Sequence, residues 1–290
     1  IGWNDTKKLI NIYGIASAMS LLHSNDRIYN ILRPINIFMD DFLFPKLLLT
    51  RCCFLQNDEY TAPESLNKFS SSLPASDVYS FAILTYRIIT DQPAFVDVTE
   101  FNYHELVYNQ RKRPEFIKPI PECYKKLIEK CWSHDPNERP TFSEIVLQLK
   151  TNPEFVTENI NKNEYYKYIE LIEETHSVKE FNQQIQQTEF SNLFQLIKID
   201  LNKLKTKPKL QFSVDINPLL LKNFVKGNKI GEGGFGVVYK SIDIKTGEEY
   251  AAKISIYEMD QCPDDTIRNL SREIDIIAKL NHPSIIKFIG

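Results

Sequence analysis

The chain has 290 residues, which is enough for two domains at ~150 residues each. It is 42% hydrophobic and 25% charged, as is ordinary for a globular protein, and 35 Lys and Arg against 38 Asp and Glu give a net charge of -3. Nothing in this balance indicates a nucleic-acid-binding or membrane-binding surface, so we expect neither kind of partner.

The first 150 residues are predicted to be mostly helical. In residues 6–22, apolar side chains recur at helical spacing: Leu9, Ile12, Tyr13, Ala16 and Met19. Residues 76–90 contain the run VYSFAILTYRIIT, which is apolar on nearly every side and therefore predicts a helix buried all round. Residues 141–144, Thr-Phe-Ser-Glu, have the spacing of a capping box and start a helix with Ile145 and Leu149 on one face.

Residues 151–222 are dominated by Asn, Gln, Lys and Glu and are expected to form a polar, partly helical linker. One amphipathic helix is indicated by Tyr165, Tyr168, Ile169 and Ile172. A second, ending near Pro208, is indicated by Phe190, Leu193, Ile197, Leu201 and Leu204. We interpret both as packing or linker helices; a coiled-coil partner site is the alternative.

From Phe224 the periodicity changes to that of strands. VKGNKI and VVYKSIDI flank a glycine-rich turn, and a second turn at Lys245-Thr-Gly247 leads into EEYAAKI. Residues 264–280 then predict a helix, with one face formed by Ile267, Leu270, Ile274 and Ile277. The predicted order is strand, glycine loop, strand, turn, strand, helix.

Five cysteines stand at positions 52, 53, 123, 131 and 262, and none forms a C-x-x-C pair. We therefore expect no metal site and no disulfide framework, but reduced thiols in the cytoplasm. No apolar run approaches the ~18 residues that a membrane span needs, and no signal peptide opens the chain. The two ends, Ile1 and Gly290, are expected to be cut from a longer polypeptide.

The run Gly231-Glu-Gly-Gly-Phe-Gly236 matches G-x-G-x-x-G, which is weak evidence alone. A dinucleotide-binding unit needs a helix directly after the glycines, whereas a strand pattern follows here, so a hairpin over phosphates is favoured. Glycines let backbone N–H groups approach phosphate oxygens closely. Lys253 follows on the next strand, where its charge needs a partner, and Glu273 on the core-facing side of the predicted helix can supply one.

Residues 224–290 resemble the small lobe of eukaryotic protein kinases through GEGGFGVV, AAK and SREIDIIAKLNHPSII. The resemblance implies that the glycine loop cradles ATP through Gly231, Gly233 and Gly236. It further implies that the adenine is lined by Ile230, Val238 and Ala251. Lys253 would hold the α- and β-phosphates and would pair with Glu273 in the active state. His282 would brace the loop before the next strand.

Residues 1–150 resemble the large lobe of the same family through YTAPE, SDVYSFAILTYRIIT and CWSHDPNERPTFSEI. The last of these is closest to the tyrosine-kinase-like serine/threonine kinases. The resemblance implies a buried ion pair between Glu64 and Arg139. It also implies that Asp77 tethers the catalytic loop. The alternative is that Asp77 simply caps its helix, and one residue can do both. The implied fold class is α+β: a mainly helical large lobe and a hairpin-rich small lobe with one helix.

The match fails at the catalytic loop. When HSNDRIYNILRPINIFMDD is aligned without gaps to the motif H-R-D-L-K-P-x-N, the catalytic aspartate falls on Ile31 and the preceding His and Arg fall on Tyr29 and Asn30. Leu49 stands where the metal-binding aspartate of D-F-G belongs. Neither side chain can do this chemistry, because isoleucine cannot accept a proton and leucine cannot bind Mg²⁺. This lobe is predicted to be a pseudokinase.

The resulting domain prediction is a partial large lobe at 1–150, a linker at 151–222 and a partial small lobe at 223–290. One hypothesis is a fragment of a tandem kinase that phosphorylates Ser/Thr in a protein substrate, with ATP, and with Mg²⁺ only in a complete domain. The other is a non-catalytic scaffold or regulatory module that binds nucleotide or signalling partners. A third idea, compatible with both, is that the small lobe docks on the large lobe in permuted order.

Overall fold

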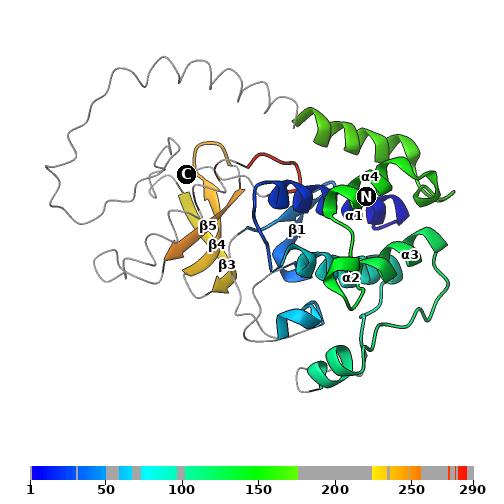
Figure 1. Ribbon diagram of the computed structural model, residues 1–290. Helices are drawn as coiled ribbons and strands as arrows, with labels where there is room; N and C mark the ends of the chain where they lie inside the picture. The colour runs from blue at the N-terminus through cyan, green and yellow to red at the C-terminus, as the bar shows by residue number, and fades with distance from the viewer. Residues whose placement is uncertain are drawn as a thin grey trace, which may run out of the picture. The chain divides into compact units, whose positions relative to one another are not determined.

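The computed structural model describes most of the N-terminal part of the chain and a three-stranded sheet near its C-terminus (Figure 1). The described residues are 2–30, 32–49, 59–66, 73–96, 102–175, 224–233, 236–247, 249–255, 274, 278 and 280–285. No helix within these ranges is long and apolar enough to cross a membrane.

The chain divides into two compact units. The first consists of Ile1–Leu49, Phe54–Glu170 and Pro283–Ile286; the second consists of Thr50–Cys53, Leu171–His282 and Lys287–Gly290. The first unit therefore continues past residue 150 and also includes a short segment from near the C-terminus.

The labelled α-helices of the first unit are α1 (Asp5–Ser24), α2 (Pro74–Thr90), α3 (Glu122–Cys131) and α4 (Phe142–Thr151). Helix α1 begins where the Asn4 side chain accepts a hydrogen bond from the backbone N–H of Lys7, and it packs against α2 and α4. Helix α2 begins at Pro74, a residue that suits the first turn of a helix. Its residues 76–86 are all buried, which confirms the predicted buried helix.

Helix α4 begins with the predicted capping box. The Thr141 side chain accepts from the backbone N–H of Glu144, and the Glu144 carboxylate accepts from the backbone N–H of Thr141 at 2.7 Å. The buried residues of α4 include the predicted Ile145 and Leu149. Phe142 packs edge-on against Phe81 of α2, with ring centroids 5.4 Å apart, so this cap sets the start of a core-forming helix.

A further helix covers residues 162–175 and confirms the first amphipathic helix of the predicted linker. Its buried face consists of Tyr165, Tyr168, Ile169 and Ile172. Tyr165 packs edge-on against Tyr13 of α1 at 5.9 Å and donates its hydroxyl to the carbonyl of Leu149 at 3.0 Å. This helix is therefore part of the core of the first unit up to Glu170, where that unit ends. The second predicted linker helix lies outside the described residues.

Shorter elements connect the helices. They are the 3₁₀ turns Pro34–Asn36, Pro63–Leu66, Pro136–Glu138 and Pro153–Phe155, a π-helical turn at His104–Asn109, and the strands β1 (Ile37–Met39) and β2 (Pro45–Leu47). Strands β1 and β2 pair antiparallel, with Ile37 opposite Leu47. The Asp40 carboxylate closes their hairpin by accepting from the backbone N–H groups of Phe42 and Phe44.

The second unit contains the antiparallel sheet β3-β4-β5, formed by Phe224–Gly233, Gly236–Asp243 and Glu249–Ser255. This confirms the three predicted strands. The predicted turn between β4 and β5 is also confirmed: Asp243 accepts from the backbone N–H of Lys245 at 2.7 Å, and Gly247 adopts a φ of +74° that suits glycine. Of the helix predicted over 264–280, the described residues 274 and 278 are helical, whereas Leu280 is not.

Candidate functional site

The Asp77 carboxylate, on α2, fixes the loop that follows α1. It is fully buried and accepts hydrogen bonds from the backbone N–H of Tyr29 at 2.8 Å and of Asn30 at 2.6 Å. The Nε2 of His23, in the last turn of α1, lies 2.9 Å from the same carboxylate. Since Leu73 is the N-cap of α2, Asp77 acts as a tether rather than as the cap, and the predicted tether is confirmed.

The tethered loop also forms hydrogen bonds with Leu48, the residue that directly follows β2. The Tyr29 hydroxyl donates to the carbonyl of Leu48 at 2.7 Å, and the backbone N–H of Leu48 donates to the carbonyl of Asn36 at 3.0 Å. Leu49, next along the chain, is partly buried. The segments 29–36 and 45–50 contain no acidic residue in the sequence. Ile31 lies outside the described residues.

Glu64 and Arg139 form the ion pair that the family resemblance predicts. Nη1 and Nη2 of Arg139 donate to the two carboxylate oxygens of Glu64 at 2.7 and 2.9 Å, and the Arg139 side chain is fully buried. Burial alone would raise the pKa of Glu64, but the hydrogen bonds and the positive charge of Arg139 outweigh it and lower that pKa. Arg139 also donates to the carbonyls of Ala75 and Ser133, so one guanidinium joins three segments of the lobe.

The glycine-rich run forms a β-hairpin in the second unit. Gly233 lies opposite Gly236 at the end of the β3-β4 ladder, and Gly231 lies opposite Val238. On the other edge of β4, Val238 lies opposite Lys253. The backbone thus aligns Gly231, Val238 and Lys253 in one row across three strands.

The remaining predicted nucleotide-site residues are placed only in part. Ala251 lies opposite Lys240, and β5 continues two residues past Lys253, to Ser255. Glu273 lies outside the described residues, as do the side chains of Ile230, Val238, Ala251 and Lys253. The pairing of Lys253 with Glu273 therefore stays a prediction.

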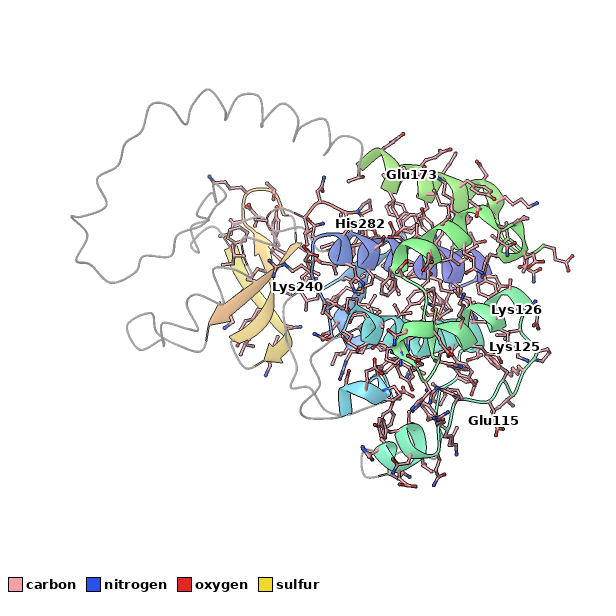
Figure 2. All side chains as sticks on the ribbon, in the orientation of Figure 1. Glu115, Lys125, Lys126, Glu173, Lys240 and His282 are labelled. Atoms are coloured by element: carbon pink, nitrogen blue, oxygen red, sulfur yellow. The ribbon has the colours of Figure 1, made fainter. Side chains whose placement is uncertain are left out.

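Two other lysines of the sheet have surface partners. The Nζ of Lys240, labelled in Figure 2, lies 2.7 Å from the Glu249 carboxylate, and both side chains are well exposed. The Nζ of Lys226 lies 3.6 Å from the centre of the Tyr239 ring. Pairs of this kind contribute little to stability, because water screens them.

The cysteines within the described ranges, Cys123 and Cys131, are free and buried. Burial raises the pKa of the Cys131 thiol well above its usual range, which makes this thiol unreactive. The described part of the chain holds no cluster of His, Cys, Asp and Glu that could bind a metal ion. Cys52, Cys53 and Cys262 lie outside it.

Comparison with known proteins matches both parts of the chain to kinase families. Residues 51–149 match the family described as protein tyrosine and serine/threonine kinase, and residues 224–290 match the protein kinase domain family. The chain therefore belongs to the eukaryotic protein kinase family, and its fold is the α+β fold of that family.

Several similar proteins come from Dictyostelium discoideum. The dual specificity protein kinase shkE is 36% identical over 91 residues, which cover 31% of this chain and 13% of that protein. The dual specificity protein kinase pyk3 is 24% identical over 287 residues, which cover 95% of this chain and 19% of that protein. A probable inactive serine/threonine-protein kinase is 31% identical over 144 residues, which cover 46% of this chain and 7% of that protein. The chain thus spans less than a fifth of the length of each of these relatives.

Proposed function

We propose that this chain is part of a tandem kinase polypeptide whose two kinase segments have different tasks. Residues 223–290 cradle ATP for phosphorylation of Ser/Thr in a protein substrate, with Mg²⁺ bound in the complete domain. Residues 1–150 form a pseudokinase large lobe that transfers no phosphate. We place the polypeptide in the cytoplasm, because the cysteine spacing predicts reduced thiols rather than a disulfide framework.

The pair of hydrogen bonds from Asp77 carries the pseudokinase part of this proposal. Because Asp77 holds the amides of Tyr29 and Asn30, these two residues are assigned to the His and Arg of the kinase catalytic motif. The next residue, Ile31, then takes the position of the catalytic aspartate. Loss of a positioned base costs ~10²–10⁴ in rate. Leu49 in the place of a metal-binding aspartate removes charge neutralisation as well.

The register of the β3-β4-β5 sheet supports the nucleotide part. Gly231 of the glycine hairpin, Val238 and Lys253 lie in one row across the three strands. Kinases hold the phosphates of ATP with a glycine-rich loop and a strand lysine arranged in this way. The hairpin would supply backbone N–H groups, and Lys253 would supply a positive charge. A single alignment with pyk3 over 95% of this chain supports the tandem order of the two segments.

Binding of a fluorescent ATP analogue to the whole chain, with and without Mg²⁺, tests the nucleotide part. We expect Lys253→Met to weaken binding about tenfold or more, because one charge-assisted contact to phosphate is lost. Lys240→Met is the matched control, since it removes a surface lysine from the same sheet. Equal affinity of Lys253→Met and the unchanged chain would overturn the assignment of Lys253.

A non-catalytic scaffold is the second candidate. It is favoured by the absence of Asp and Glu from residues 29–36 and 45–50 and by the similarity to a probable inactive kinase. Assays of nucleotide binding and phosphate transfer on the longest natural polypeptide that contains this chain distinguish the two candidates. Nucleotide binding without transfer of phosphate favours the scaffold. Metal-dependent phosphorylation of a generic protein substrate rules it out.

A further inference from the structure

A short segment near the C-terminus is built into the N-terminal lobe. Pro283, Ser284 and Ile285 come from the part of the chain that matches the protein kinase domain at 224–290. They nevertheless belong to the first compact unit, together with α1 and α2 (Figure 1). Figure 2 labels His282, the residue just before this segment.

Strand β2 holds the segment through its backbone. The backbone N–H of Leu47 donates to the carbonyl of Ser284 at 2.7 Å, and Leu47 and Ile285 form a parallel bridge. The Nζ of Lys46 donates to the carbonyl of Pro283 at 2.5 Å. Ile285 thus adds a single parallel bridge to β2, directly after a turn formed by Pro283 and Ser284.

Side chains complete the contact. The hydroxyls of Tyr168 and Ser284 lie 2.7 Å apart, and both residues are almost completely buried, at 2% and 0% exposure. Phe44, which follows the Asp40 hairpin turn, packs on the Tyr168 ring at 4.6 Å. Tyr168 belongs to the helix at 162–175, which follows the large lobe predicted at 1–150. This helix therefore takes part in binding Ser284.

Gly14 makes room for this contact. A Cβ at this position of α1 would stand 2.3 Å from the Tyr168 hydroxyl oxygen, 2.7 Å from the Ser284 hydroxyl oxygen and 2.9 Å from Cγ of Pro45. Such distances are too short for any side chain. Glycine is unfavourable within a helix, so its place in α1 is explained by the close approach of these three residues.

We propose that Gly14, Lys46, Leu47 and Tyr168 form a docking seat for the segment Pro283–Ile285 of the same chain. The N-terminal lobe is then completed by a segment of the C-terminal kinase match, in permuted order. This inference does not depend on nucleotide binding.

The hydroxyl pair gives the seat its selectivity. A buried hydroxyl without a hydrogen-bond partner is costly, so the seat favours a turn that presents a small hydroxyl side chain opposite Tyr168. Pro283 suits the turn at residues 283 and 284, and the β-branched Ile285 suits the bridge to Leu47. A bulkier or charged residue at position 284 would meet Gly14 and the buried hydroxyl of Tyr168.

The test uses the whole chain with a protease recognition sequence inserted at residue 200. After cleavage, we expect the two pieces to stay together in size-exclusion chromatography. Ser284→Asp buries an unpaired charge in the seat and is expected to raise the dissociation constant of the two pieces about tenfold or more. Ser143→Asp is the matched control, because Ser143 carries a similar hydroxyl pair with Ser20 at an exposed position.

Separation of the unmutated pieces after cleavage would overturn the proposal, as would equal affinity of Ser284→Asp and Ser143→Asp. Light scattering on the uncut chain adds a second check. A monomer supports docking within one chain. A dimer that is lost on Ser284→Asp would show that the segment comes from a second copy and would overturn the assignment to the same chain.

Discussion

The carboxylate of Asp77 and the backbone amide of Tyr29 lie 2.8 Å apart, although 48 positions separate them in the chain. This hydrogen bond joins the buried α2 helix to the loop in which the kinase match fails. The tether of that loop is present, and residues 29–36 next to it include neither Asp nor Glu.

Replacement of Asp77 by alanine tests this tether. The backbone amides of Tyr29 and Asn30 would lose their charged acceptor, and hydrogen bonds to charged groups contribute ~1.5–3 kcal/mol each. We expect the free energy of unfolding in urea to fall by about 3 kcal/mol, with the α2 helix itself retained in circular dichroism. Asp135→Ala is the control, because that residue caps an exposed turn. Equal losses for both variants would contradict a tether.

Because of the Glu64–Arg139 pair, we expect the free energy of unfolding to depend on pH in the acidic range. The pKa of Glu64 in the folded chain is lowered below its ordinary value of 4.5, so its contribution is fully present above pH 4.5 and is lost as the pH falls through the lowered value. Glu64→Gln should therefore be less stable than the unchanged chain at pH 7, and the difference should narrow below pH 4.5. Urea midpoints at both pH values measure this, and a constant difference would contradict it.

Substitution of Gly14 by alanine should destabilise the chain, against the trend of helix propensity. Alanine ordinarily gains ~1 kcal/mol over glycine within a helix. Here its Cβ overlaps the hydroxyls of Tyr168 and Ser284. Overpacking of this kind costs ~1–3 kcal/mol, so we expect a net loss of about 1 kcal/mol in thermal or urea unfolding. A stabilised variant would mean that the close approach is absent in solution.

Cys131 should resist alkylation in the folded chain. It is completely buried, and burial raises the pKa of its thiol, so the reactive thiolate is scarce at neutral pH. Mass spectrometry after iodoacetamide treatment should find Cys131 modified only when urea is present. Modification without urea, at the rate of an exposed thiol, would contradict the packing of α3.

Local patterns in the sequence were enough for several elements. The buried α2 helix follows from an apolar run, the start of α4 from Thr141 and Glu144, and the turn before β5 from Gly247. Each of these depends on residues within a few positions of one another, so periodicity and capping chemistry are sufficient. The Glu64–Arg139 pair and the Asp77 tether followed instead from the family resemblance, and the geometry confirms both.

The nucleotide-site residues are a mixed case. The sequence predicted the strands that carry the glycines and Lys253, and the register confirms those strands. The roles of these residues and the partnership of Lys253 with Glu273 remain predictions, because Glu273 and the Lys253 side chain lie outside the described residues. The nucleotide-binding experiment tests the role of Lys253 in holding phosphate, not its pairing with Glu273.

By itself, the amino-acid sequence predicted the helices α1, α2 and α4, the helix at 162–175, the strands β3, β4 and β5, and the kinase character of both segments. Only the tertiary structure decided that Tyr168 meets Ser284, 116 positions away, beside a glycine in α1. Local periodicity assigns each of these residues to an element, but it does not say which buried faces pack together. That choice depends on shape and on paired buried hydroxyls, which exist only once the chain is folded.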